Sequence, residues 1–181
     1  NSFSLATVPG ASCAICMPRA TISSVIRMPA PPDGSIPAIL RMLGTARLMG
    51  RCIEKETGQP EERGQVASVF VNRLTRDMRL QTDPTVIYGI TKGKGVLGRG
   101  LRASELRRVT PWNTYVIEGL PPTPIANPGA ASLEAAANPD ATRFVFFVAD
   151  GTGGHAFAET LEDHNRNVAR WRTIEADRAN N

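Results

Sequence analysis

Two acidic residues, Glu54 and Glu56, end a segment in which apolar residues recur every three or four positions from Ile39 to Ile53. This spacing predicts an amphipathic helix, and at 100° per residue Glu56 lies about 60° from Ile53, at the margin of the apolar stripe. Glu54 lies about 100° away on the other side and is expected to face water. A carboxylate at the edge of a core loses hydration, which raises its pKa and favours proton donation near neutral pH. Glu56 is therefore the candidate catalytic acid, the alternative being that both acids are solvated charges at a helix end.

Polar and aromatic residues gather in the middle of the chain, in segments rich in turn-forming residues. Amides, hydroxyls and aromatic rings on such loops can bind sugars, and the same residue types also stabilise ordinary turns. A histidine in the Gly-rich segment 150–155 is open to the same two interpretations. The candidate ligand-binding residues are Gln81, Thr82, Asp83, Asn113, Tyr115, Asn127 and His155.

Two short motifs suggest other chemistry but lack the surrounding elements that this chemistry needs. The segment 93–98 has the GxGxxG spacing of a dinucleotide-binding loop, yet the segment before it is less apolar than a buried parallel strand. Cys13 and Cys16 have a CxxC spacing without a second pair for zinc, and the two histidines have no metal-binding spacing. We therefore expect no metal site and no cofactor, and keep a nucleotide-binding domain as a distant alternative.

The pattern of the chain changes near residue 38. Six prolines precede this point and disfavour both long helices and central strands, so residues 1–38 are predicted to be irregular or disordered. Residues 39–181 are predicted to form one compact domain of the α+β class, with a small mixed sheet and flanking helices. The predicted elements are helices over 39–57, 60–74, 103–109, 130–137 and 160–176, and strands over 85–89 and 143–149, the last one buried on both faces.

The net charge of +4 is concentrated at the start of the chain. Residues 1–50 carry four arginines and one aspartate, which leaves 17 basic and 16 acidic residues in 51–181. This near-neutral balance argues against a nucleic-acid partner. No run approaches the roughly 18 apolar residues of a membrane span, and no signal peptide is recognisable. The chain is therefore expected to be a soluble fragment, with any membrane anchor outside it.

A series of longer motifs carries a family resemblance. In this order they resemble the endolytic murein transglycosylases, the YceG-like family, over roughly residues 50–172. The motifs are Glu54-Lys-Glu-Thr-Gly58, Glu62-Arg63, Val66-Ala-Ser-Val-Phe-Val-Asn-Arg-Leu74, Met78-Arg-Leu-Gln-Thr-Asp-Pro-Thr-Val-Ile-Tyr-Gly89, Asn113-Thr-Tyr115, Gly119-Leu-Pro-Pro122, Ile125-Ala-Asn-Pro-Gly129, Phe147-Val-Ala-Asp-Gly151 and Gly154-His155.

The resemblance implies a bacterial inner-membrane enzyme whose catalytic domain lies on the periplasmic side. Such enzymes cleave the β-1,4 bond between N-acetylmuramic acid and N-acetylglucosamine within glycan strands and leave 1,6-anhydro ends. The family's catalytic glutamate matches Glu56, which would act first as an acid and then as a base. Peptidoglycan strands are the implied substrate, and cell-wall synthases are candidate partners.

The sequence departs from the family before this glutamate. The family's membrane helix and small LysM-like subdomain are not recognisable in residues 1–50, and Leu48-Met-Gly-Arg-Cys52 replaces a run of small and aliphatic residues. A glycan-binding remnant without turnover is therefore kept as the alternative function.

Overall fold

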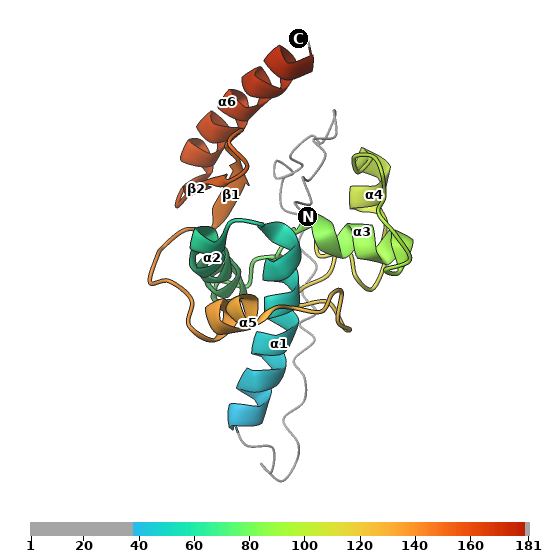
Figure 1. The fold of residues 1–181 in the computed structure, drawn as a ribbon, viewed down its shortest axis with the longest axis vertical. Coiled ribbons are helices and arrows are strands. Elements are labelled where there is room, and N and C mark those ends of the chain that lie inside the picture. The colour runs from blue at the N-terminus through green and yellow to red at the C-terminus, as the bar shows by residue number, and fades with distance from the viewer. Residues whose placement is uncertain (1–37, 180–181) are drawn as a thin grey trace.

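The structure, a computed structural model, describes residues 38–179 (Figure 1). Apart from Ala38, the predicted irregular stretch over 1–38 lies outside these residues, as does the Cys13–Cys16 spacing. In the described part, helices surround one small sheet, which confirms the α+β class. None of the helices within residues 38–179 has the length and hydropathy that crossing a membrane would require.

Three helices form the centre of the molecule: α1 (Ala38–Glu56), α2 (Arg63–Thr75) and α5 (Ala130–Ala137). They pack against one another, with a 3-10 turn, η1 (Pro60–Glu62), leading into α2 (Figure 1). Ile53, Val66 and Phe70 are fully buried in the core they share. These helices confirm the pattern of apolar residues at every third or fourth position.

A glycine sets how closely α1 and α5 approach each other. A Cβ atom at Gly50 would lie 3.2 Å from the carbonyl oxygen of Ser132 and 3.1 Å from Cδ2 of Leu133. Both separations are tighter than ordinary van der Waals contact. Gly50 lies within the helix and costs some helix propensity, but its lack of a side chain permits this close crossing.

The segment predicted as a strand over 85–89 is instead a helix, α3 (Asp83–Thr91). Pro84 lies in its first turn, where a missing N–H costs no hydrogen bond, and Asp83 places negative charge at the helix N-terminus. Lys92 ends the helix in the left-handed conformation, and its N–H bonds the carbonyl of Tyr88 at 2.7 Å. The β-branched residues misled the prediction because burial of Thr85 and Val86 overrides their strand preference.

A loop and a short helix, α4 (Ala103–Arg107), follow α3 and form a lobe at the side of the molecule (Figure 1). Leu101 and Leu106 pack with Val86 in a small second core. The dinucleotide-binding alternative is wrong, because the GxGxxG segment follows a helix rather than a strand and the next helix begins only at residue 103.

The sheet consists of β1 (Phe146–Ala149) and β2 (His155–Ala158), which pair antiparallel with Phe147 opposite Phe157. Helix α6 (Leu161–Ala179) packs against both strands and extends away from the start of α1 (Figure 1). The prediction of a strand buried on both faces over 143–149 is wrong, because β1 starts at 146 and only Val148 in it is buried. A two-stranded ribbon has no inner strand, so both of its strands lie at an edge.

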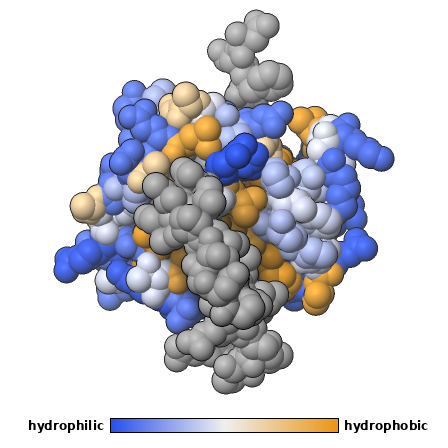
Figure 2. Space-filling view, turned by 90° about the horizontal axis from the view of Figure 1, so that it is seen from below, coloured by the Kyte–Doolittle hydropathy of each residue, from blue (hydrophilic) through white to orange (hydrophobic). Residues whose placement is uncertain are grey.

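The visible surface is mixed. Seen along the long axis from below, hydrophilic residues line most of the edge of the face, and hydrophobic residues show both toward its middle and at a few places on the edge (Figure 2). The only large hydrophobic side chains exposed in the described part are Ile90, Val96, Val109 and Leu161. Three of these four belong to the lobe of α3, α4 and their adjoining loops.

Candidate active site

Glu56 is the last residue of α1, and its carboxyl group meets the segment that leads into α3. The hydroxyl of Thr82 donates a hydrogen bond of 2.7 Å to Oε2 of Glu56. Thr82 itself has no exposed surface, whereas Glu56 keeps part of its surface exposed. One carboxyl oxygen is thus held from inside the protein, and the residue as a whole remains reachable from outside.

The environment of Glu56 favours its protonated form. Burial raises the pKa of Glu56 from 4.5 to about 8. The Thr82 hydrogen bond lowers this pKa, the charge of Asp83 raises it, and the charge of Arg73 lowers it. A carboxyl group with a pKa near 8 carries its proton at neutral pH, so Glu56 can act as a general acid there.

Glu54 lies two residues before Glu56, and its pKa is shifted in the opposite direction. Its Oε2 accepts hydrogen bonds of 2.6 Å from the hydroxyl of Ser132 and 3.0 Å from the N–H of Gly129, at the start of α5. Partial burial alone would raise the pKa of Glu54, but these hydrogen bonds lower it. Glu54 keeps part of its surface exposed, but its carboxylate also joins α5 to α1, which the sequence did not predict. The two neighbouring acids thus have pKa shifts of opposite direction.

A network of threonines places Thr82 beside Glu56. The hydroxyl of Thr114 lies 3.1 Å from the N–H of Thr82, and it also shares a hydrogen bond of 2.8 Å with the hydroxyl of Thr85. The hydroxyl of Thr85 also lies 2.7 Å from the carbonyl of Thr82. All three threonines are fully buried. Thr82 therefore holds Glu56 from the buried side through this hydrogen bond. It has no exposed surface to offer a ligand, contrary to the prediction that it contacts one.

Gln81 precedes Thr82 and has a left-handed backbone with φ of 51°. Its side-chain oxygen accepts a hydrogen bond of 3.0 Å from the buried guanidinium of Arg73. The same guanidinium also donates to the carbonyls of Leu80, at 3.1 Å, and Val145, at 2.6 Å. Arg73 thus joins α2, the segment before α3 and the start of the sheet.

The charge of Asp83 acts on Glu56, and the side chain of Asp83 is hydrogen-bonded to Tyr115. The phenol of Tyr115 donates a hydrogen bond of 2.5 Å to Oδ1 of Asp83. Burial raises the pKa of Asp83, and the Tyr115 hydrogen bond lowers it. The structure thus brings Thr82, Asp83 and Tyr115 to the neighbourhood of Glu56.

Asn113 does not line a cleft, which corrects its prediction as a ligand-binding residue. It has no exposed surface. Its side-chain nitrogen donates to the carbonyls of Glu105, Leu106 and Arg108, at 3.2, 3.0 and 2.7 Å. Its side-chain oxygen accepts the N–H of Tyr115 at 2.9 Å. Asn113 therefore closes the end of α4 and orients Tyr115.

The last two predicted residues lie on other elements. Nδ1 of His155 is 2.8 Å from Oε2 of Glu62, and its backbone N–H donates to Oε1 of Glu62 at 2.7 Å. Oε2 of Glu62 also accepts the hydroxyl of Thr57, the neighbour of Glu56, at 3.1 Å. His155 is thus tied to the end of α1 through Glu62. Asn127 is exposed on the loop before α5.

No metal site is evident among residues 38–179, where no group of three or more His, Cys, Asp or Glu side chains could hold an ion. Cys52 is fully buried beside Ile53 in the core. Burial and the charge of Glu56 raise the pKa of its thiol to about 12, so this cysteine is an inert part of the packing.

With this geometry in place, comparison with known proteins decides the family. A sequence model described as the YceG-like family matches residues 46–170, which run from the middle of α1 into α6. The chain belongs to the YceG-like family. The match includes Glu56 and all the predicted ligand-binding residues.

Relatives of this YceG-like chain carry a functional name. It is 44% identical over 119 residues to a protein of Bacillus subtilis named endolytic murein transglycosylase, covering 65% of this chain and 32% of the relative. A Streptococcus pneumoniae protein with the same name is 37% identical over 123 residues, covering 65% of this chain and 22% of the relative. The chain therefore spans a third or less of the length of these two relatives.

A solved structure supports the fold of the YceG-like chain. The crystal structure of a yceG-like protein from Listeria monocytogenes matches with a TM-score of 0.60 and 44% identity. The match covers 65% of this chain and 38% of the other.

Sequence reasoning missed three residues that build the site of the YceG-like chain: Arg73, Glu62 and Thr114. All three lie inside or beside motifs that carried the family resemblance. Their signal was a charged or polar residue within an otherwise apolar or turn-forming motif, because a buried polar side chain needs partners and often orients a site.

Proposed function

We propose that this chain contains the catalytic domain of an endolytic murein transglycosylase, over residues 39–181. The observation that carries the proposal is the contrast between two neighbouring acids: burial raises the pKa of Glu56 to about 8, whereas the pKa of Glu54 is lowered. Such separation of pKa values marks an acid that can donate a proton at neutral pH. The shared name of the two relatives supports the substrate, which is the glycan strand of peptidoglycan.

In the proposed reaction, Glu56 donates its proton to the oxygen that links N-acetylmuramic acid to N-acetylglucosamine. The bond between this oxygen and the muramic acid C1 breaks, and an oxocarbenium-like centre forms. The 6-hydroxyl of the same muramic acid attacks C1 and gives its proton to the Glu56 carboxylate. A 1,6-anhydro ring closes, the enzyme returns to its starting state, and no water is consumed. The tethered hydroxyl has the entropic advantage of an intramolecular nucleophile.

The surroundings of Asp83 support this single-acid chemistry. A hydrolase would need a second carboxylate to activate water or to attack the sugar. Asp83 is the nearest acid to consider, but burial raises its pKa and Tyr115 holds its Oδ1 at 2.5 Å. We assign Asp83 to orienting substrate and the α3 N-terminus rather than to activating water.

The other predicted residues divide into two proposed roles. Gln81, Tyr115, Asn127 and His155 keep exposed surface, and we propose that they contact the glycan. Thr82 and Asn113 are fully buried, and we propose that they position Glu56 and Tyr115. We further propose that the domain acts on the outer side of the bacterial inner membrane, as part of a longer protein, and beside cell-wall synthases.

The products of cleavage test the proposed reaction. Incubation of the chain with purified peptidoglycan should release fragments with anhydro-muramyl ends, which are lighter than hydrolytic ends by the mass of one water. Mass spectrometry of the soluble fragments measures this difference. Reducing muramic acid ends alone would replace the transglycosylase with a muramidase, and Asp83 would then be the first candidate for a second acid. Binding of strands without any cleavage would support the non-catalytic alternative.

The pH dependence of cleavage tests the role of Glu56 as the acid. Because its pKa is about 8, kcat/KM should stay level below that pH and fall about tenfold per pH unit above it. Thr82→Val removes the hydrogen bond that lowers the pKa of Glu56, so the falling limb should move to higher pH. An unchanged limb in Thr82→Val would show that another group controls it. Thr75→Val, on an exposed threonine at the end of α2, is the matched control.

A further inference from the structure

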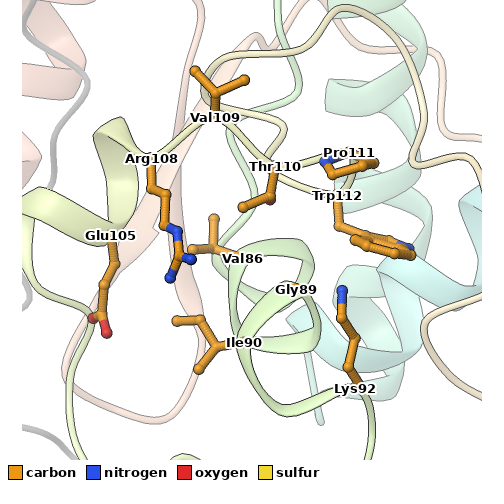
Figure 3. Close-up of a pocket in the computed structure, with 10 residues that line it drawn as sticks. All are labelled: Val86, Gly89, Ile90, Lys92, Glu105, Arg108, Val109, Thr110, Pro111 and Trp112. Atoms are coloured by element: carbon orange, nitrogen blue, oxygen red, sulfur yellow. The ribbon is translucent and has the colours of Figure 1, made fainter.

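A pocket of about 370 Å³ lies between α3, α4 and the loop that follows α4 (Figure 3). Val86 and Ile90, on one face of α3, form its apolar wall, and Val109 stands at its rim. Val109 is 84% exposed, so its side chain is available to a ligand at this rim. The pocket does not include Glu56 and has no part in the proton transfer described above.

Two cations face this pocket. Nζ of Lys92 lies 3.2 Å from the centre of the Trp112 ring, which forms the opposite wall (Figure 3). The guanidinium of Arg108 points between α3 and α4, and no hydrogen bond or ion pair of this group is found among the described residues. The acid at the pocket wall, Glu105, is already paired with Arg99 through contacts of 2.5 and 2.9 Å. The pocket therefore offers positive charge that the protein itself does not neutralise.

The charge of the surrounding lobe is of the same sign. Residues 92–108 contain six basic residues and one acidic residue, a balance of +5. Residues 51–181 together carry a net charge of only +1, so the residues of this range outside 92–108 carry −4. The near-neutral total thus conceals a strongly basic lobe beside α3. Such a lobe attracts anionic groups to the pocket.

The pocket lies within reach of the reacting bond. Thr82, immediately before α3, contacts Glu56, and the apolar wall of the pocket continues along the same helix to Ile90. At 1.5 Å per residue, Ile90 lies about 10 Å beyond the start of α3 along its axis. A peptide in extended form covers roughly 3.5 Å per residue, so one of three to five residues attached to a sugar beside Glu56 can enter the pocket.

We propose that this pocket binds the short peptide stem that a muramic acid of the glycan strand carries. This inference rests on the proposed function and extends it to the part of the substrate that is not cleaved. Arg108 and Lys92 bind the carboxylates of the stem, and Ile90 and Val109 contact its alanine methyl groups. A guanidinium is well suited to a carboxylate because it can donate two parallel hydrogen bonds. The site would select strands that carry peptides over strands that have lost them.

Binding of a sugar-free stem peptide tests this inference separately from catalysis. The full chain is titrated with the synthetic pentapeptide stem, and its dissociation constant is measured by calorimetry. Arg108→Gln should weaken binding about tenfold, the usual effect of losing one charged hydrogen bond. Arg107→Gln is the matched control, because Arg107 is an exposed neighbour on α4 that does not line the pocket, and its effect should stay within about twofold. Amidation of the peptide's carboxylates should weaken binding to the unchanged chain as much as Arg108→Gln does.

Three results would overturn the inference: no binding by the unchanged chain, equal weakening by Arg107→Gln and Arg108→Gln, or binding through Arg108 to phosphatidylglycerol vesicles but not to the peptide. The last would identify a lipid-binding surface instead. Glu56→Gln should bind the peptide as the unchanged chain does. Failure of the unchanged chain to cleave peptidoglycan would therefore refute the proposed function, while peptide binding would still decide the role of the pocket.

Discussion

Glu56→Gln should lower the rate of glycan cleavage by about a thousandfold and, at the same time, make the protein more stable at neutral pH. The amide keeps the shape of the side chain and can still accept the Thr82 hydroxyl, but it can neither donate nor accept the proton of the reaction. Cleavage is measured by the release of soluble muropeptides, and stability by thermal or denaturant unfolding.

The gain in stability follows from the raised pKa of Glu56. In the unfolded chain the carboxyl ionises near its ordinary pKa of 4.5, whereas in the folded chain it ionises near 8. The folded state therefore holds the proton more tightly, and its free energy of unfolding falls as the pH rises from about 4.5 to 8. Gln has no such dependence, so Glu56→Gln should exceed the unchanged chain by about 1–3 kcal/mol near pH 7.5 and show little advantage below pH 4.5.

Glu54→Gln is the matched control, and its effect on stability should have the opposite sign. Its lowered pKa and its bonds to Ser132 and Gly129 show that the Glu54 charge stabilises the contact between α1 and α5. The amide weakens these charge-assisted bonds, so stability should fall by about 1 kcal/mol while most cleavage activity remains. Equal loss of activity in both variants would refute the assignment of Glu56 as the acid.

Asn113→Ala should destabilise the protein by about 3 kcal/mol, because it removes one buried and three part-buried hydrogen bonds, to the carbonyls of Glu105, Leu106 and Arg108 and from the N–H of Tyr115. Unfolding should shift to lower temperature by on the order of 10 °C. Activity should fall as well, since Tyr115 would no longer be held against Asp83. Thermal unfolding and kcat/KM measured on the same preparation test both effects.

Asn127→Ala provides the comparison, since Asn127 is an exposed asparagine on a loop. Its stability should change by less than about 0.5 kcal/mol, and a contact with the glycan would show as a raised KM at unchanged kcat. If Asn113→Ala instead left stability unchanged and raised only KM, Asn113 would contact the substrate and its placement here as a positioning residue would be wrong.

The sequence by itself determined the helices of the described residues other than α3, and the position of Glu56 on one of them. The spacing of Met49 and Ile53 fixes which face of α1 is apolar, and the rotation of 100° per residue then places Glu56 at its margin. Helix geometry of this kind is local, so it can be read from neighbouring residues alone. The motifs of the family are equally local strings of residues, and they fixed the family for the same reason.

The tertiary structure decided which polar residues are buried in hydrogen-bond networks and which keep exposed surface. Whether Glu54 meets water or α5 depends on Ser132, 78 residues away, and the role of Asn113 depends on where α4 ends. The residues after Asp83 favour a strand by their intrinsic propensity, but they form α3 because one face of this helix is buried in the small second core. A pKa, a buried hydrogen bond and a pocket all depend on which distant atoms exclude water, and this is known only when the chain has packed against itself.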